Sequence, residues 1–231
     1  MNKTKLVFVR HGQSIGNAQH VLLGHTNLDL SELGYRQAEI AARAFLNEKV
    51  DAIYASDLKR AYNTALAHAK LRGMTVIPDE GFREIYLGAW EGASTAEFRE
   101  NKNPLFEDFC YRFGYFAPPN GEGVWELSER IFAAAKRVAG ENPGKTLLIG
   151  THAAAIRMFF AKILGYGSEE VSNYLPFPTN ASFSVCEYDG ERFVPIEFSR
   201  DEHIIDELSI QSSHIIFGKG ELLKCNERSF W

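Results

Sequence analysis

Two histidines and two arginines of this sequence are of the residue types that phosphate chemistry uses. They are Arg10, His11, Arg60 and His152. A histidine can attack or carry a proton near neutral pH because its reference pKa is about 6.5, and the planar guanidinium of arginine binds two phosphate oxygens at once. The charge on a transferring phosphoryl group must be met by fixed donors. The four residues predict a phosphoryl-transfer site if the fold brings them together.

Three apolar segments must position these residues. Residues 6–9, 51–55 and 146–149 are short hydrophobic runs that predict buried strands. Arg10 and His11 directly follow the first run, Arg60 lies one turn into the helix expected after the second, and His152 closely follows the third. Because ligands of open α/β folds bind beyond the carboxyl ends of the strands, we expect the four side chains to converge there.

The segments between the strands have the spacing of amphipathic helices. Helical stripes are expected over residues 33–45, 58–69, 124–138 and 155–163, with Ser31 and Ser56 as candidate caps for the first two. A hairpin is expected around Asp189-Gly190. Alternating strands and helices predict an α/β three-layer sandwich, a mostly parallel sheet with helices on both faces.

The alternation of strands and helices is interrupted at residues 88–123, which contain three prolines, several glycines and many aromatic residues. We interpret them as an insertion, or cap, over the carboxyl end of the strands, part helix and part loop. Its aromatic rings either form the insertion's own core, which we favour slightly, or face a leaving group with apolar surface. The whole chain, residues 1–231, is expected to be one domain.

Composition limits the classes of partner. The chain has 231 residues, a net charge of −5 and no long run of Lys or Arg, which argues against a nucleic-acid surface. Its three cysteines are widely spaced, so neither a disulfide framework nor a zinc site is indicated, and a cytoplasmic location is expected. No apolar stretch has the length of a membrane span.

In combination, the motifs resemble those of the histidine phosphatase superfamily, also called phosphoglycerate mutase-like. The similar segments are Leu6-Val7-Phe8-Val9-Arg10-His11-Gly12-Gln13-Ser14, Leu30-Ser31-Glu32-Leu33-Gly34, Ser56-Asp57-Leu58-Lys59-Arg60-Ala61, Arg83-Glu84-Ile85, Gly88-Ala89-Trp90-Glu91-Gly92 and Gly150-Thr151-His152. They lie within residues 4–160. The resemblance does not extend to residues 200–231, an unmatched C-terminal extension with a possible strand at residues 212–217.

The resemblance implies roles for individual residues. It implies that His11 carries the phosphoryl group, that Glu84 is the proton donor, and that Asn17 joins Arg60 and His152 in binding phosphate. From the chemistry we expect Arg10 to bind phosphate as well, His152 to act as a cation, and the second nitrogen of His11 to donate to a backbone carbonyl. Glu84 needs a raised pKa to act first as acid and then as base.

No metal or other cofactor is expected, because the guanidinium groups supply positive charge and the sequence has no His-x-His, His-Glu-x-x-His or dense aspartate cluster. The expected partner is a small phosphorylated metabolite, and a homodimer remains open. We expect a phosphatase that hydrolyses a phosphate monoester. The alternatives are a phosphoglycerate mutase-type phosphotransferase and a non-catalytic phosphate-binding protein.

The sequence departs from the family pattern at one place. The family commonly has two glycines after the second histidine, where this chain has Ala153 and Ala154. If both positions need only helical backbone angles, the methyl groups cost little. If one backbone must approach the phosphate closely, the methyl groups crowd the pocket.

Overall fold

One sheet of seven strands organises the computed structural model, which describes residues 3–204 and 215–216. The strand order is β3-β2-β4-β1-β5-β6-β7. The strands are β1 (Thr4–Arg10), β2 (Ala52–Ala55), β3 (Val76–Pro78), β4 (Thr146–Thr151), β5 (Phe183–Tyr188), β6 (Phe193–Arg200) and β7 (Ile215–Ile216). The first four pair in parallel, and β5, β6 and β7 join them antiparallel. The predicted α/β fold and hairpin are confirmed.

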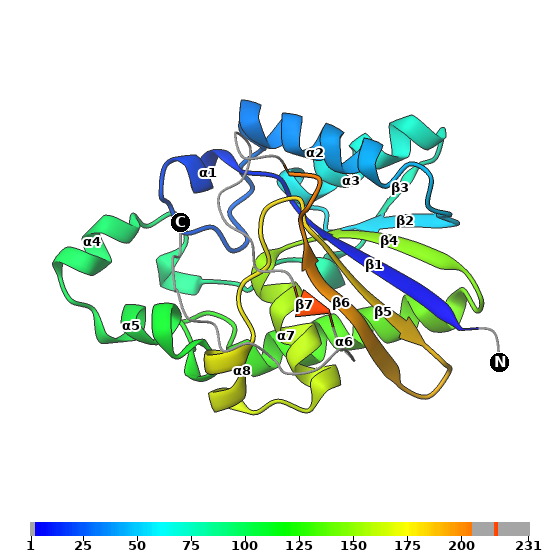
Figure 1. Ribbon diagram of the computed structural model, residues 1–231. Coiled ribbons are helices and arrows are strands. Elements are labelled where there is room, and N and C mark those ends of the chain that lie inside the picture. The colour runs from blue at the N-terminus through cyan, green and yellow to red at the C-terminus, as the bar shows by residue number, and fades with distance from the viewer. Residues whose placement is uncertain (1–2, 205–214, 217–231) are drawn as a thin grey trace.

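Helices cover both faces of the sheet (Figure 1). On one face lie α2 (Glu32–Ala44) and α3 (Lys59–Arg72), and on the other α6 (Val124–Glu141) and α7 (Ala153–Leu164). Successive residues of a strand point to opposite faces. Accordingly, Leu6 and Phe8 of β1 belong to one hydrophobic cluster, and Val7 and Val9 belong to the other. Burial on both faces explains why β1 reads as a continuous apolar run.

Of the two helix caps expected from the sequence, the structure has one and lacks the other. Ser31 caps α2, with its hydroxyl accepting a hydrogen bond from the Gly34 amide at 3.0 Å. Gly73 ends α3 with a φ of 64°, a left-handed conformation that glycine adopts without strain. The prediction that Ser56 caps α3 is wrong. That helix begins at Lys59 with Leu58 in the cap position. The Ser56 hydroxyl accepts a hydrogen bond from the Leu58 amide at 3.3 Å and lies 2.9 Å from Nε2 of His152.

The insertion, residues 88–123, extends beyond the carboxyl ends of the parallel strands (Figure 1). It contains η2 (Gly88–Trp90), α4 (Thr95–Glu100), α5 (Pro104–Tyr111) and η3 (Phe113–Tyr115). Tyr111 and Tyr115 are exposed, but the other large rings are buried or partly buried against one another, with centroids 5.1 Å apart for Phe109 and Phe116 and 5.3 Å apart for Trp90 and Phe116. These rings are therefore the insertion's own core, the interpretation favoured from the sequence.

Three short elements complete the described structure: α1 (Ile15–Ala18), η1 (Glu80–Phe82) and α8 (Ser168–Tyr174). Helix α8 was not expected from the sequence. The strand expected at residues 212–217 lies mostly outside the described residues, apart from β7. Phe230 and Trp231, like most of the C-terminal extension, also lie outside them.

Candidate active site

His11 lies directly beyond the end of β1 and is only 4% exposed. Its Nδ1 lies 2.6 Å from the carbonyl oxygen of Gly12. A carbonyl can only accept, so this contact places the proton on Nδ1 and leaves Nε2 with its lone pair. Burial, followed by the charges of Arg60 and Arg10, lowers the pKa of His11 well below its ordinary value. The protein therefore holds His11 neutral, the state in which an imidazole can act as a nucleophile.

Gly12 is required at its position because another piece of backbone approaches it closely. A side-chain Cβ there would lie 2.3 Å from the carbonyl oxygen of Gly34. The amide of Gly12 donates to the Thr64 hydroxyl at 3.1 Å, which anchors the turn to α3. The glycine of Arg10-His11-Gly12 thus lets the end of β1 pack against the beginning of α2.

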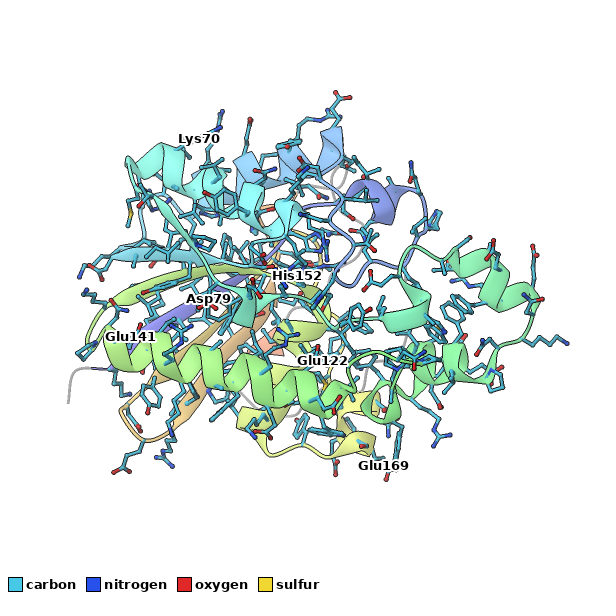
Figure 2. The ribbon with its side chains drawn as sticks, turned by 180° about the vertical axis from the view of Figure 1, so that it is seen from behind. Lys70, Asp79, Glu122, Glu141, His152 and Glu169 are labelled. Carbon is cyan, nitrogen blue, oxygen red and sulfur yellow. The ribbon has the colours of Figure 1, made fainter. Side chains whose placement is uncertain are left out.

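His152 follows β4 and lies in the N-cap position of α7, at the carboxyl end of the parallel strands (Figure 2). Its ring centroid is 5.2 Å from that of His11, and its Nε2 is 2.9 Å from the Ser56 hydroxyl. Burial, and then the charge of Arg60, lowers the pKa of His152 well below its ordinary value. In the protein without a ligand His152 is therefore neutral, and the expectation that it is a cation is wrong for this state. A bound phosphate dianion would raise the pKa of His152.

Arg10 and Arg60 bring two buried guanidinium groups to the same place. Burial lowers the pKa of each to about 10, so both remain charged at neutral pH. Arg60 donates to the carbonyl oxygens of Gly24 at 2.8 Å and Thr26 at 3.0 Å, and Arg10 donates to that of Pro178 at 2.6 Å. Each arginine also lowers the pKa of His11, which shows that their charges converge on its ring.

Glu84 is a buried carboxyl group held by backbone amides. It accepts hydrogen bonds from the amides of Ile85 at 3.0 Å, Ala154 at 3.2 Å and Ala155 at 3.1 Å. Burial raises its pKa, while these amides and the charges of Arg60 and Arg10 act against burial, and the net pKa remains raised. A carboxyl group with a raised pKa can donate a proton near neutral pH.

Ala153 and Ala154 occupy the first turn of α7, and neither has a positive φ. The amide of Ala154 binds Glu84, which places this turn against the carboxyl group. Helical angles suit alanine better than glycine. The first of the two possibilities left open by the sequence, that the methyl groups cost little, agrees with this geometry.

Among the described residues, the side chain of Asn17 is hydrogen-bonded to Ser14 and not to the charged residues of the site. Its side-chain oxygen accepts a hydrogen bond from the Ser14 amide at 3.1 Å, and its own amide donates to the Ser14 hydroxyl at 3.0 Å. This capping box fixes the side-chain amide at the start of α1. In the part of the chain that the structure describes, no hydrogen bond joins Asn17 to His11 or to the arginines.

Several groups that shape the site were not anticipated from the sequence. The carboxylate of Glu91 accepts hydrogen bonds from the backbone amides of Gly24, His25 and Thr26, and so builds the loop whose carbonyl groups hold Arg60. Burial alone would raise the pKa of Glu91, but hydrogen bonds from the Thr26 hydroxyl and from the backbone amides of Leu87, His25 and Thr26 outweigh it and lower the pKa. Asn180 donates to the His11 carbonyl oxygen at 2.9 Å.

We call residues 10–12, 24–26, 56–60, 84 and 150–154 the rim. Three buried rim nitrogens, Nε of Arg10, Nε of Arg60 and Nδ1 of His152, have no hydrogen-bond partner among the described residues. Leaving a buried donor without a partner costs about 1–3 kcal/mol, so a ligand that supplied acceptors to these nitrogens would remove that cost. The oxygens of a phosphate fit donors of this kind.

The described residues contain neither a cluster of metal ligands nor a membrane-spanning helix. Within the described residues, no three or more His, Cys, Asp or Glu side chains are grouped so that they could hold a metal ion. Among the helices at described positions, none is long and apolar enough to cross a membrane.

Comparison with known proteins places these observations in a family. The chain is 30% identical over 188 residues to putative phosphoserine phosphatase 2 of Hydrogenobacter thermophilus, covering 81% of this chain and 91% of that protein. It is 30% identical over 161 residues to phosphoglycerate mutase-like protein 4 of Arabidopsis thaliana, covering 68% and 70%. The solved structure of Bacillus stearothermophilus YhfR superposes with a TM-score of 0.82 at 27% identity, covering 87% of this chain and 100% of that one.

These relatives support a phosphatase within a group that also includes mutase-like proteins. The sequence model of the histidine phosphatase superfamily (branch 1) matches residues 6–200, farther than the motifs by themselves reached. The chain belongs to the histidine phosphatase superfamily.

Proposed function

We propose that the protein hydrolyses a small phosphate monoester through a covalent phosphohistidine on His11. The observation that carries the proposal is the hydrogen bond from His11 Nδ1 to the Gly12 carbonyl oxygen, because it leaves Nε2 as a fixed, unprotonated nucleophile. The buried charges of Arg10 and Arg60 act on the same ring and suit a phosphate dianion.

In the first step, the lone pair of His11 Nε2 attacks phosphorus and the ester P–O bond breaks. The departing oxygen takes a proton from Glu84, whose raised pKa favours the protonated form. Arg10, Arg60 and His152 hold the phosphoryl oxygens, with the NH2 group of Asn17 as a further donor. His11 then carries the phosphoryl group, and Glu84 is a carboxylate.

In the second step, water enters and gives a proton to the Glu84 carboxylate. The water oxygen attacks phosphorus, the P–N bond breaks, and His11 Nε2 regains its lone pair. Inorganic phosphate leaves, and both residues return to their starting protonation states. A mutase would instead return the phosphoryl group to a second hydroxyl of the same substrate.

The test is incubation with 4-nitrophenyl phosphate and with 3-phosphoglycerate, each with and without EDTA. We expect hydrolysis that chelation does not change and that His11→Ala abolishes, together with an acid-labile phosphoprotein in the native enzyme alone. The matched control is His20→Asn, which removes another imidazole while keeping a residue type that tolerates the left-handed φ of 54° at that position.

Each other outcome contradicts the proposal in a distinct way. Release of 2-phosphoglycerate would identify a mutase. Binding of phosphate without turnover of any ester would identify a binding protein. Loss of activity with EDTA would contradict a reaction that relies on guanidinium groups alone for positive charge.

A further inference from the structure

Arg130 of α6 divides the hydrogen bonds of its guanidinium group between the carboxylate of Glu122 and the chain segment that contains Glu84. Its Nε and Nη2 bind the two carboxylate oxygens of Glu122 at 2.8 and 2.7 Å. Its other contacts are to main-chain carbonyl oxygens, with Nη1 bound to those of Gly81 at 3.2 Å and Arg83 at 3.0 Å, and Nη2 bound to that of Glu84 at 3.0 Å. One planar fork therefore fixes the backbone from residue 81 to residue 84.

Glu122 also binds the backbone of Tyr86, two residues after Glu84. Its amide donates to the Tyr86 carbonyl oxygen at 2.8 Å, and its carboxylate accepts from the Tyr86 amide at 3.3 Å. Glu122 belongs to the last residues of the insertion and lies beside α6 in the view of Figure 2. The Arg130–Glu122 pair thus joins α6, the end of the insertion and residues 81–86.

The carboxyl group of Glu84 is held from the opposite side by α7. The amides of Ala154 and Ala155 bind its oxygens, while Arg130 and Nε2 of His25, at 3.0 Å, bind the Glu84 carbonyl oxygen. A side chain that transfers a proton must lie within hydrogen-bond reach of the reacting oxygen, and a displacement of about 1 Å can cost about 100-fold in rate. The position of the carboxyl group therefore depends on the backbone that Arg130 holds.

We propose that Arg130, oriented by Glu122, is a positioning residue for proton transfer by Glu84. The proposal rests on the proposed function, in which Glu84 protonates the leaving group. Arg130 touches neither the phosphate nor the leaving group in this scheme. Lysine cannot replace it, because an ammonium is a single point of charge and cannot span a carboxylate and three carbonyl oxygens.

The proposal predicts a dependence on the leaving group that a purely structural role would not produce. A leaving group that is stable as an anion, such as 4-nitrophenolate, needs little help from an acid. A strongly basic one, such as phenolate, needs the proton. Values of kcat/KM are the correct measure, because they report the step in which the ester bond breaks and not the later hydrolysis of phosphohistidine.

We therefore compare Arg130→Lys with the native enzyme on phenyl phosphate and 4-nitrophenyl phosphate. We expect kcat/KM for phenyl phosphate to fall about 10- to 100-fold and that for 4-nitrophenyl phosphate by less than about threefold. The control is Arg137→Lys, the same exchange in the same helix at an arginine that pairs with Asp79 and Glu141. It should change both values by less than about twofold.

Glu122→Gln is the second variant, used in case Arg130→Lys unfolds, which thermal melting reports. It keeps the side-chain shape but opposes one arginine donor with an amide NH2, so we expect a smaller loss of the same selective kind. Equal losses on both esters, or none, in folded variants would overturn the positioning role. Absence of turnover by the native enzyme would instead contradict the proposed function, so the two failures are distinguishable.

Discussion

The rim and the insertion lie next to each other but are stabilised by different interactions. The charged side chains at the centre of the rim are buried and held largely by backbone groups, as Glu84 is by three amides and Arg60 by two carbonyl oxygens. The insertion is held by stacked and edge-on rings around Phe109 and Phe116. Substitutions in the rim should therefore affect chemistry first, and substitutions in the insertion should affect stability first.

The difference has a physical origin in desolvation. Burial shifts the pKa values of His11, His152 and Glu84 in the directions that favour their neutral forms. The same burial costs an aromatic ring nothing and gains hydrophobic free energy. In the rim, burial of ionisable groups therefore lowers stability and shifts their pKa values. In the insertion, burial of aromatic rings raises stability.

The largest expected effect on stability is in the insertion. Phe116→Ala should lower the free energy of unfolding by about 3–5 kcal/mol, because it leaves a cavity among Trp90, Phe109 and Phe113. Urea denaturation measures the loss. Below the unfolding transition, kcat/KM for 4-nitrophenyl phosphate should change little. A large fall in activity of the folded variant would show that the rings face the substrate, which would remove the distinction between the two regions.

The next effect depends on pH and has no counterpart in the insertion. His68 of α3 is buried against Phe183 of the sheet, outside the rim, and burial lowers its pKa to about 3, whereas residues 88–123 contain no histidine. The unfolded chain binds a proton at this residue near pH 6.5 and the folded chain does not, so its contribution to stability is present above that pH and is lost as the pH falls toward 3.

Linkage gives a loss of about 2 kcal/mol from His68 between pH 7 and pH 5. Urea unfolding of the native protein and of His68→Phe at both pH values measures this contribution. The variant should lose less stability over the same interval, with the difference close to the linkage value. An unchanged pH dependence would show that His68 is accessible to protons in the folded state.

The smallest effect is in the rim. Ala154→Gly restores a residue common in the family, and we expect it to destabilise α7 by up to about 1 kcal/mol because glycine has the lower helix propensity. Activity should stay within about twofold, since the amide that binds Glu84 remains. Thermal melting and kcat/KM measure the two effects, with exposed Ala133→Gly in α6 as the control. A large gain in kcat/KM would mean that the methyl group crowds the pocket.

Most of the rim was predictable from the sequence because parallel strands share a direction. Arg10 is the last residue of β1, and His11, Arg60 and His152 follow β1, β2 and β4, whose carboxyl ends meet because the strands are parallel neighbours. Ser56 lies in the same position after β2, so the strand-end argument could also have assigned it to the site. It was interpreted as a helix cap because serine is common there, but its hydroxyl lies two residues before the cap position.

Residues that hold the rim from other parts of the chain were not predictable in this way. Pro178 and Asn180 come just before β5, and β5 is antiparallel to β1, so its beginning lies at the end where β1 finishes. The hairpin signal gave no information about which edge of the sheet it joins. Glu91 and Arg130 form hydrogen bonds with backbone amide or carbonyl groups of distant loops. Almost every residue has such groups, so the sequence does not indicate which of them are used.

By itself, the sequence determined the buried strands, the helices between them and the residue types at the strand ends, because hydrophobic periodicity and strand direction are local properties. Only the tertiary structure decided how those residues are held. The tautomer of His11, the neutral state of His152, the raised pKa of Glu84 and the fork of Arg130 all depend on burial and on contacts between segments far apart in the chain. Desolvation and hydrogen-bond geometry arise from the surroundings of a group, and the sequence fixes those surroundings only through the complete fold.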